Sequence, residues 1–224
     1  MNPLSNLPPI TKNIILINIV VFIAQNFIPN FTQNFALHFY ASPDFKPYQL
    51  LTHMFMHGSI SHIFFNMFAL FMFGAALEYR MGPKRYFTYY LLTGFGAVML
   101  HFASMYWESY STLMEIQQYV AQGQLTPEQI SNAYFNTFHV TLGASGALFG
   151  VLAGFAMLYP NQELFLMFIP IPIKAKYFVL GYAAIELFLG VSGSSNDNIA
   201  HFAHLGGALF GFIIIKEWQR KRLI

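Results

Sequence analysis

Several polar residues stand out because they interrupt long apolar stretches of the sequence. Three stretches carry them near their starts, and the residues are Ser145, His201, His204, His62 and Asn66. A polar side chain is expensive in an apolar medium, so each one needs a structural or chemical reason. A serine hydroxyl becomes a nucleophile when an adjacent base accepts its proton, and histidine is suited to that task at neutral pH. These residue types therefore indicate nucleophilic catalysis by Ser145, with His204 or His201 as the base.

A hydrolase also needs hydrogen-bond donors for the negative charge that develops on the substrate oxygen. His62 and Asn66 are four residues apart, so on a helix they project from the same face. The backbone N–H of Ser145 is a third candidate donor, because the first turn of a helix leaves its N–H groups free. No Asp or Glu near the starts of the stretches that hold Ser145 and His204 is an obvious orienter for the base. This absence favours a dyad over a triad.

The composition shows what kind of protein has to position these residues. Of the 224 residues, 56% are hydrophobic and only 9% are charged, whereas a typical soluble domain carries roughly 25% charged residues. The chain has no cysteine, which excludes a disulfide scaffold. Its 26 Phe and 13 Tyr exclude disorder. A net charge of +2 without a basic face argues against nucleic acid as a partner. The class that remains is an integral membrane protein in a lipid bilayer.

Six segments are apolar enough to cross a bilayer, which takes roughly 20 residues per helix. They lie at about 10–28, 60–77, 86–107, 142–159, 175–191 and 199–215. The runs are long and continuous, which favours helices over the alternating strands of a membrane barrel. We expect an all-α polytopic fold, a single domain over 1–224, with long outside loops at about 29–59 and 108–141. A turn at 196–198 is expected to precede the last span.

The distribution of charge predicts the orientation. With the N-terminus in the cytoplasm, only Lys46 of the 11 Lys and Arg residues falls outside, as the positive-inside rule requires. Both termini are then cytoplasmic. The second, fourth and sixth spans all begin on the same side of the membrane. His62, Ser145 and His204 therefore share one face and a similar depth.

Small residues recur every fourth position in two of these spans. The two stripes are Gly146, Gly150 and Gly154 in the fourth span, and Ala203, Gly207 and Gly211 in the sixth. Such spacing lets helix backbones approach closely in lipid. If the two stripes face each other, the hydroxyl of Ser145 and the imidazole of His204 come within reach.

Four motifs, taken together, resemble the rhomboid family of intramembrane serine proteases. GASG at 143–146 resembles the family's G-x-S-G, and AHLGGALFG at 203–211 resembles its A-H-x-x-G-x-x-x-G. HIFFN at 62–66 matches H-x-x-x-N, and EYRMG at 78–82 resembles E-x-R-x-G. The motifs occur in family order on the expected spans. The likeness covers nearly the whole chain, from about residue 13 to 216.

The resemblance implies a fold, an activity and a set of site residues. The fold is a six-helix rhomboid-like bundle, and the activity is a serine endopeptidase that cuts single-span membrane proteins near the outer face, without cofactor or metal. The implied roles are nucleophile for Ser145, base for His204, oxyanion site for His62, Asn66 and the Ser145 amide, ring stacking on the base for Phe149, and support from Gly143 and Gly207. His201 remains a competitor for the base but lacks the family's glycine spacing.

The loops depart from the family or leave questions open. The Trp-Arg pair of many relatives is absent from the first outside loop, and Tyr40, Phe45 and Tyr48 are the alternatives for anchoring it. In the 108–141 loop, Thr126 followed by Pro-Glu predicts a helix start. We favour a short solvated helix there over a binding element.

Further ionisable residues have plain interpretations. His53 and His57 are four apart, and ordinary polar packing is favoured over a metal site. His101 is expected to hydrogen-bond to a neighbouring helix, and Glu78 to Arg80 or to backbone amides. Glu186 is either protonated and satisfied by a neighbour or part of a gate.

Two other functions compete with the protease. One is a relative without catalysis that binds transmembrane clients, although such proteins have usually lost the serine or the histidine. The other is a histidine-rich metal or proton transporter, which the position of the histidines at one end disfavours. The short chain, with no appended domain and no transit peptide, favours a bacterial inner membrane over an organelle.

Overall fold

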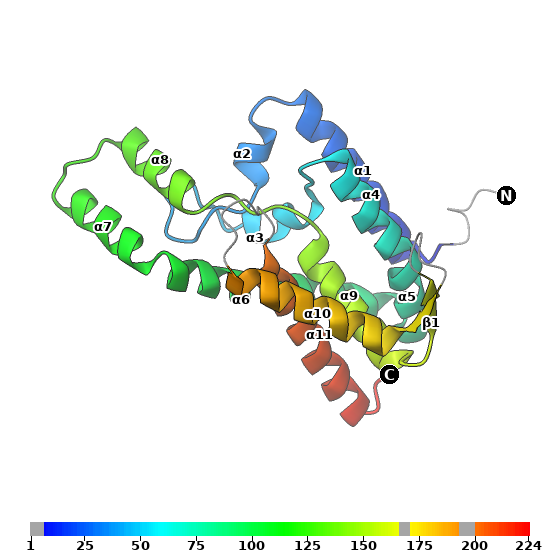
Figure 1. The fold of residues 1–224 in the computed structure, drawn as a ribbon. Helices are drawn as coiled ribbons and strands as arrows, with labels where there is room; N and C mark the ends of the chain where they lie inside the picture. The colour runs from blue at the N-terminus through cyan, green and yellow to red at the C-terminus, as the bar shows by residue number, and fades with distance from the viewer. Residues whose placement is uncertain (1–6, 166–170, 193–199) are drawn as a thin grey trace.

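The structure is a computed structural model that describes residues 7–165, 171–192 and 200–224, and these are mostly helical (Figure 1). The main helices are α1 (Pro9–Phe27), α4 (Ile60–Ala69), α5 (Ala75–Met81), α6 (Pro83–Glu108), α7 (Tyr110–Ala121), α8 (Pro127–Thr137), α9 (Ser145–Leu158), α10 (Ala175–Ser192) and α11 (His201–Arg220). The shorter elements are α2 (Phe31–Phe35), α3 (Gln49–Thr52), η2 (His53–Phe55), the π-helical η3 (Leu70–Gly74), and the strands β1 (Glu163–Phe165) and β2 (Pro172–Lys174). The strands form a small antiparallel hairpin before α10. The expectation of a purely α-helical chain needs that addition.

Each predicted span falls on a helical segment, although the bounds differ. Three segments are long and apolar enough to cross a membrane, namely Pro9–Phe27, Ile60–Met81 and Ala175–Ser192. The second of these continues past the predicted end at 77 through α5. The fourth predicted span is shortened, because its helix begins at Ser145 and not at 142. The predicted turn at 196–198 and the start of the last span at 199 lie outside the described residues.

Helix α9 forms the centre of the molecule. Eleven of its 14 residues are buried, as expected for a helix that is hydrophobic on every side. It packs against α11 and α6 along most of its length. Fourteen residues span only about 21 Å, less than the roughly 30 Å of a bilayer core. Helix α9 is therefore too short to cross the full thickness of a bilayer core by itself.

The small residues of α11 lie directly on the α9 backbone, so one of the two predicted stripes faces its partner helix. The glycines of α9 themselves face α6, where a Cβ on Gly150 would meet Thr93 and one on Gly154 would meet Tyr89. A Cβ placed on Gly207 would collide with the carbonyl oxygen of Gly146, and one on Gly211 would lie 2.8 Å from the carbonyl oxygen of Gly150. These are backbone atoms, which cannot rotate away as a flexible side chain can. Glycine is therefore required on α11, and the two helices meet as closely as their backbones allow.

Glu78 ties the start of α1 to the end of α5. Its carboxylate accepts hydrogen bonds from the backbone N–H groups of Ile10 and Thr11 at 2.9 and 2.7 Å, and from the Thr11 hydroxyl at 2.8 Å. It thus satisfies N–H groups that the first turn of α1 cannot pair internally. Of the two partners expected for Glu78, the structure has the backbone amides. Gly82 then turns the chain with φ 81° into α6.

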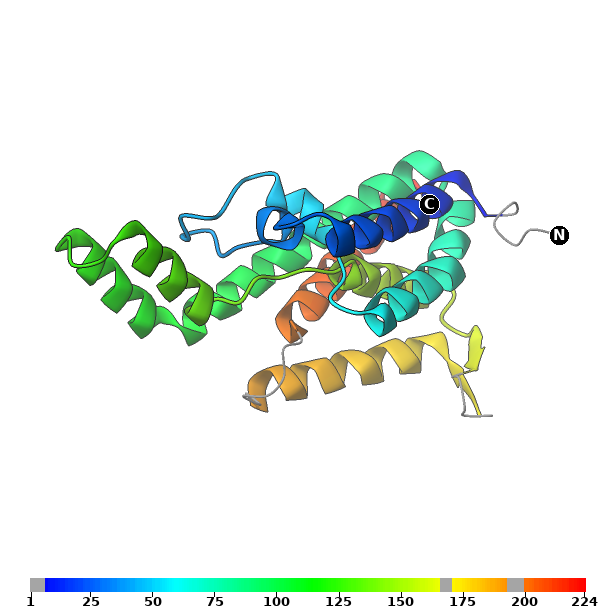
Figure 2. The ribbon, with the colours of Figure 1, turned by 90° about the horizontal axis from the view of Figure 1, so that it is seen from above.

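Helices α7 and α8 form a hairpin that extends away from the other helices (Figures 1 and 2). Thr126 caps α8 with a reciprocal capping box, which confirms the predicted helix start. The hairpin has its own small core, separate from that around α9; its buried members are Phe39, Leu113, Ile116, Tyr134 and Phe138. The 108–141 loop is therefore a packed pair of helices rather than one short solvated helix.

The first long loop is anchored on this hairpin by a residue that the sequence did not single out. The ring of Phe39 stacks on Phe138 with centroids 3.9 Å apart and planes 6° apart, and Phe39 is fully buried. Tyr40 and Tyr48, two of the expected anchors, are each 48% exposed. Of the three expected anchors, Tyr40 does contact this core, because its ring lies 4.5 Å from that of Phe39 and 5.9 Å from that of Phe102. Phe45 is partly buried. Phe39, which was not among them, is the most deeply buried ring of the loop.

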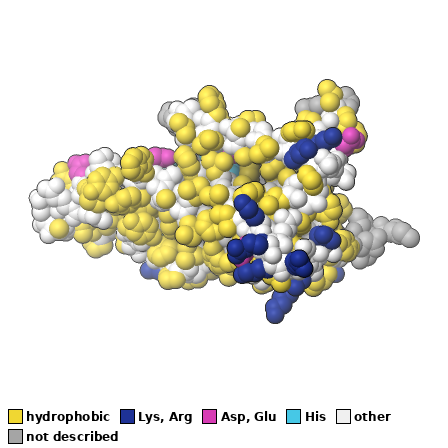
Figure 3. All heavy atoms as spheres, turned by 90° about the horizontal axis from the view of Figure 1, so that it is seen from below, with side chains coloured by type: hydrophobic (Ala, Val, Ile, Leu, Met, Phe, Trp, Pro, Cys, Tyr) yellow, Lys and Arg dark blue, Asp and Glu magenta, His cyan; other side chains and the backbone are white. Residues whose placement is uncertain are grey.

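Lys and Arg side chains gather in one area of the face shown in Figure 3, and much of the remaining surface there is hydrophobic. Helix α10 lies along one side of the molecule in Figure 2 and contacts α11 and α9. Such a charge distribution is what the positive-inside rule expects of cytoplasmic ends. Six spans and the cytoplasmic termini stay predictions.

We expect Gly207→Ala to lower the free energy of unfolding by about 2 kcal/mol or more, because the added methyl group has to displace a backbone carbonyl. Thermal unfolding in detergent micelles measures the change. Gly181→Ala on α10 is the matched control, since a Cβ there meets nothing within 4 Å. In a helix this control is neutral or slightly stabilising. Equal stability of the two variants would contradict the close helix contact.

Candidate active site

Ser145 and His204 meet at the point where α9 and α11 begin. The Oγ atom of Ser145 lies 2.9 Å from Nε2 of His204. Ser145 is the first residue of α9, and His204 is in the first turn of α11. His204 is only 8% exposed, whereas Ser145 is half-buried. The arrangement lets the hydroxyl donate to an imidazole that is shielded from most of its surroundings.

Aromatic rings fix the plane of the His204 imidazole. The ring of Phe149, one helical turn after Ser145, stacks on it with centroids 4.2 Å apart and an interplanar angle of 6°. Tyr182 of α10 packs against Phe149 in turn at 4.7 Å. The position implied for Phe149 by the family resemblance is the position the structure gives it. The stacked ring restricts rotation of the imidazole, whose Nε2 lies 2.9 Å from Ser145 Oγ.

His62 and Ser145 lie on either side of Gly143. A Cβ on Gly143 would be 3.1 Å from Nε2 of His62 and 3.5 Å from Oγ of Ser145, and the residue has φ 134°. The Nδ1 atom of His62 accepts from the N–H of Gly58 at 3.5 Å, a long hydrogen bond. That tautomer leaves the proton on Nε2, the nitrogen nearer to Ser145. Glycine at 143 keeps the space between the two side chains open.

Asn66 is held by a histidine that the sequence had not placed in the site. Its side-chain amide donates to Nε2 of His57 at 3.0 Å, and the rings of His57 and His62 meet edge to face at 4.9 Å. Burial, with the nearby His62 adding to it, lowers the pKa of His57 to about 3. A neutral His57 can accept this hydrogen bond. The H-x-x-x-N spacing revealed Asn66, but nothing in the sequence linked it to the loop that carries His57.

The remaining histidines at this end are explained by packing. Nδ1 of His53 bonds to the carbonyl oxygen of Gln49 at 2.7 Å, and Nε2 of His101 bonds to Oγ1 of Thr141 at 2.7 Å. A partner on a neighbouring helix was expected for His101, but its partner Thr141 lies in the segment before α9. Among the described residues, no group of three or more His, Cys, Asp or Glu side chains could hold a metal ion.

Glu186 reaches the site from α10. Its Oε2 atom lies 2.6 Å from Nδ1 of His201 and 3.0 Å from Nδ1 of His204, and the residue is buried. The preference for a dyad considered only the two stretches that carry Ser145 and His204, whereas Glu186 comes from a third segment, α10. His201, the competitor for the base, faces Glu186 with its Nδ1.

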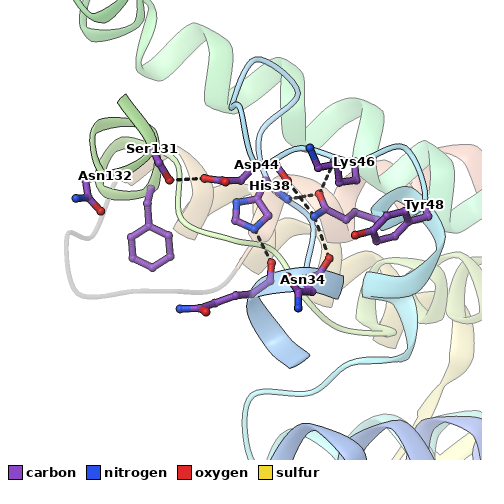
Figure 4. Close-up of a pocket in the computed structure, with 10 residues that line it drawn as sticks. Asn34, His38, Asp44, Lys46, Tyr48, Ser131 and Asn132 are labelled. Atoms are coloured by element: carbon purple, nitrogen blue, oxygen red, sulfur yellow. Dashed lines mark hydrogen bonds between the residues drawn. The ribbon is translucent and has the colours of Figure 1, made fainter. Parts of the chain in front are cut away.

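A cavity of about 440 Å³ lies elsewhere, between the first long loop and α8 (Figure 4). It is lined mainly by polar side chains, among them His38, Asp44, Lys46 and Asn132. A hydrogen bond from Ser131 of α8 to Asp44 closes one side of it. The described residues that line it do not include Ser145 or His204. This cavity lies between the first long loop and the α7–α8 hairpin, and it is separate from the candidate active site.

Comparison with known proteins agrees with the fold and the motifs. Residues 44–217 match the Rhomboid domain, which is more than half of the chain. This protein belongs to the rhomboid family, and it is accordingly an integral membrane protein.

Similar proteins include both mitochondrial and bacterial relatives. The chain is 29% identical to RHOMBOID-like protein 12, mitochondrial, of Arabidopsis thaliana, over 77% of this chain and 46% of that protein. It is 26% identical to Rhomboid protein 1, mitochondrial, of Saccharomyces cerevisiae (75% and 42%) and 27% identical to Rhomboid protease AarA of Providencia stuartii (72% and 52%). The chain thus spans about half the length of these relatives. Because several of these relatives are mitochondrial, the comparisons do not support the expected location in a bacterial inner membrane over one in an organelle.

The buried histidines predict how stability depends on pH. Burial lowers the pKa of His53 to about 4, from an unfolded value near 6.5. Stability from this neutral form is complete above about pH 6.5, and it is lost as the pH falls toward 4 because the unfolded chain binds the proton first. Between pH 7.5 and pH 5, we expect wild type to lose about 1–2 kcal/mol more of its free energy of unfolding than the His53→Gln variant does.

Thermal unfolding at several pH values measures this slope. His139→Gln, at an exposed position, is the matched control and should keep the wild-type slope. A His53→Gln variant with the full wild-type pH dependence would contradict the prediction.

Proposed function

We propose that this chain is an intramembrane serine endopeptidase that cleaves transmembrane segments of membrane proteins near the outer face of the bilayer. The observation that carries the proposal is the 2.9 Å distance between Oγ of Ser145 and Nε2 of His204. A nucleophile and its base have to be within such hydrogen-bond reach. Membership of the rhomboid family supports the same reaction class.

The chemistry follows from the atoms at the site. Ser145 Oγ attacks the scissile carbonyl carbon while its proton passes to Nε2 of His204. The carbonyl oxygen becomes an oxyanion, for which the Ser145 N–H, His62 and Asn66 are the proposed donors. Collapse of the intermediate breaks the C–N bond, and the His204 proton goes to the leaving amine. Water then hydrolyses the acyl-enzyme by the same steps, with His204 again as base.

The bilayer sets the geometry for the substrate. We propose six spans (α1, α4 to α5, α6, α9, α10 and α11) with both termini in the cytoplasm, so that Ser145 faces the outer side. The proposed substrates are single-span membrane proteins. Their helix has to unwind locally, because hydrogen bonds and side chains shield a helical peptide bond. The activity needs no cofactor and no metal, since the serine and histidine supply both nucleophile and base.

Labelling by a fluorophosphonate probe tests the proposal without knowledge of the natural substrate. We expect folded wild-type protein in detergent to be labelled, and Ser145→Ala and His204→Ala to lose labelling, because one lacks the nucleophile and the other the base. His201→Ala should still be labelled, although more slowly than wild type, because it keeps both Ser145 and His204 and loses only the partner of Glu186. Cleavage of a single-span substrate protein by wild type, but not by Ser145→Ala, is the second readout.

Two results would overturn the proposal. One is cleavage by Ser145→Ala at the wild-type rate. The other is folded wild type that neither takes the probe nor cuts any single-span substrate, which would favour a client-binding relative without catalysis. Circular dichroism and size-exclusion chromatography in detergent establish that each variant is folded.

A further inference from the structure

We propose that Glu186 of α10 is a positioning residue for His204, so that Ser145, His204 and Glu186 form a triad. His201 anchors the carboxylate of Glu186. The inference rests on the proposed function, because it concerns the base of that reaction. It assigns a task to a segment that carries neither the nucleophile nor the base.

Geometry gives the first argument. Nε2 of His204 accepts the hydrogen bond from the hydroxyl of Ser145, so the ring proton of neutral His204 is on Nδ1. The nearest acceptor to this buried nitrogen is Oε2 of Glu186, at 3.0 Å. The oxygen lies off the line of the N–H bond, so the resting contact is an ion-pair contact and not an aligned hydrogen bond.

His201 explains how the carboxylate is held in place. Its Nδ1 atom lies 2.6 Å from the same oxygen of Glu186, and both residues are buried. His201 and His204 are three residues apart, so both rings project from one face of α11 toward α10. A buried carboxylate is expensive unless it is paired. The two imidazoles provide that pairing, and they fix where the negative charge lies relative to His204.

The charge matters when the reaction begins. Proton transfer from Ser145 Oγ to Nε2 makes His204 an imidazolium, with its positive charge next to Glu186. The carboxylate stabilises this ion without accepting a proton, and the Nε2 proton later goes to the leaving amine. In a site largely shielded from water, such a contact is much stronger than on an exposed surface. The carboxylate also favours the tautomer that leaves Nε2 free to act as base.

Other ionisable groups act on the same residues and must be kept constant in a test. His62 of α4 and His101 of α6 are within electrostatic reach of His204, and Tyr182 of α10 is within reach of Glu186. Substitution at Glu186 leaves the covalent structure of all three unchanged, but Tyr182 loses the charge beside it. Tyr182→Phe in the wild-type and Glu186→Gln backgrounds separates that effect from the effect on His204.

Glu186→Gln is the decisive variant, because glutamine keeps the shape and can still accept from His201 but has no charge. We expect kcat for a single-span substrate to fall about tenfold or more with KM little changed. We also expect the acidic limb of the pH–rate profile to move to lower pH, since an imidazolium without its carboxylate is harder to form. His201→Asn is the matched control for a purely structural tie between α10 and α11.

The outcomes separate this inference from the proposed function. If wild type cleaves in a Ser145-dependent way while Glu186→Gln keeps the wild-type kcat and pH profile, only the role of Glu186 is overturned. If Glu186→Gln and His201→Asn lose equal activity and neither moves the pH profile, Glu186 is a structural tie and the inference is again overturned. If wild type does not cleave at all, the proposed function fails first.

A second measurement covers the case in which Glu186→Gln does not fold. Solid-state NMR of protein with ¹⁵N-labelled histidine reports which ring nitrogen of His204 carries the proton, with Ser145→Ala and His204→Ala used for assignment. The inference requires a protonated Nδ1 in folded wild type at neutral pH. A His204 with its proton on Nε2 would overturn it.

Discussion

The close contact between the α9 and α11 backbones is the constraint on which the rest of this structure depends. Both helices begin at the same end of the molecule, so their separation there sets the distance from Ser145 to His204. Gly207 and Gly146 allow backbone contact just below the pair. A side chain at Gly207 would collide with the carbonyl oxygen of Gly146, so it would push the two helices apart next to this pair. Small residues that look like packing detail therefore determine whether a nucleophile and its base meet.

Buried polar groups in this protein come as linked sets, as an apolar environment demands. One set joins Glu78 to the first turn of α1. Another joins His57 to Asn66 beside the candidate oxyanion site. The third joins Glu186 to His201 and His204. Each set connects segments far apart in the sequence, so each also fixes how those segments pack.

There are physical reasons why some features of this protein could be predicted from the sequence and others could not. Span parity and the four-residue stripes placed Ser145 opposite His204, because periodicity and membrane thickness are local rules that a sequence displays. Phe39 and His57 lie in an irregular loop, whose path depends on tertiary contacts and leaves no periodic signal. Glu186 was visible as a buried carboxylate in an apolar segment. Its partners were not, because the rotation of α10 relative to α11 is set by side-chain packing that no spacing rule specifies.

The length of α9 connects the fold to access. A helix of about 21 Å cannot cross a bilayer core of roughly 30 Å from end to end. In the proposed arrangement of six spans, Ser145 at the start of α9 would thus lie below the headgroups. The proposed hydrolysis consumes water, which lipid does not supply, so water would have to reach Ser145 from the outer side. The polar side chains that surround the start of α9, His62 and Asn66 among them, make that end of the bundle the region where water is tolerated. The residues that are proposed to bind the oxyanion thus also make this end of the bundle polar enough to admit water.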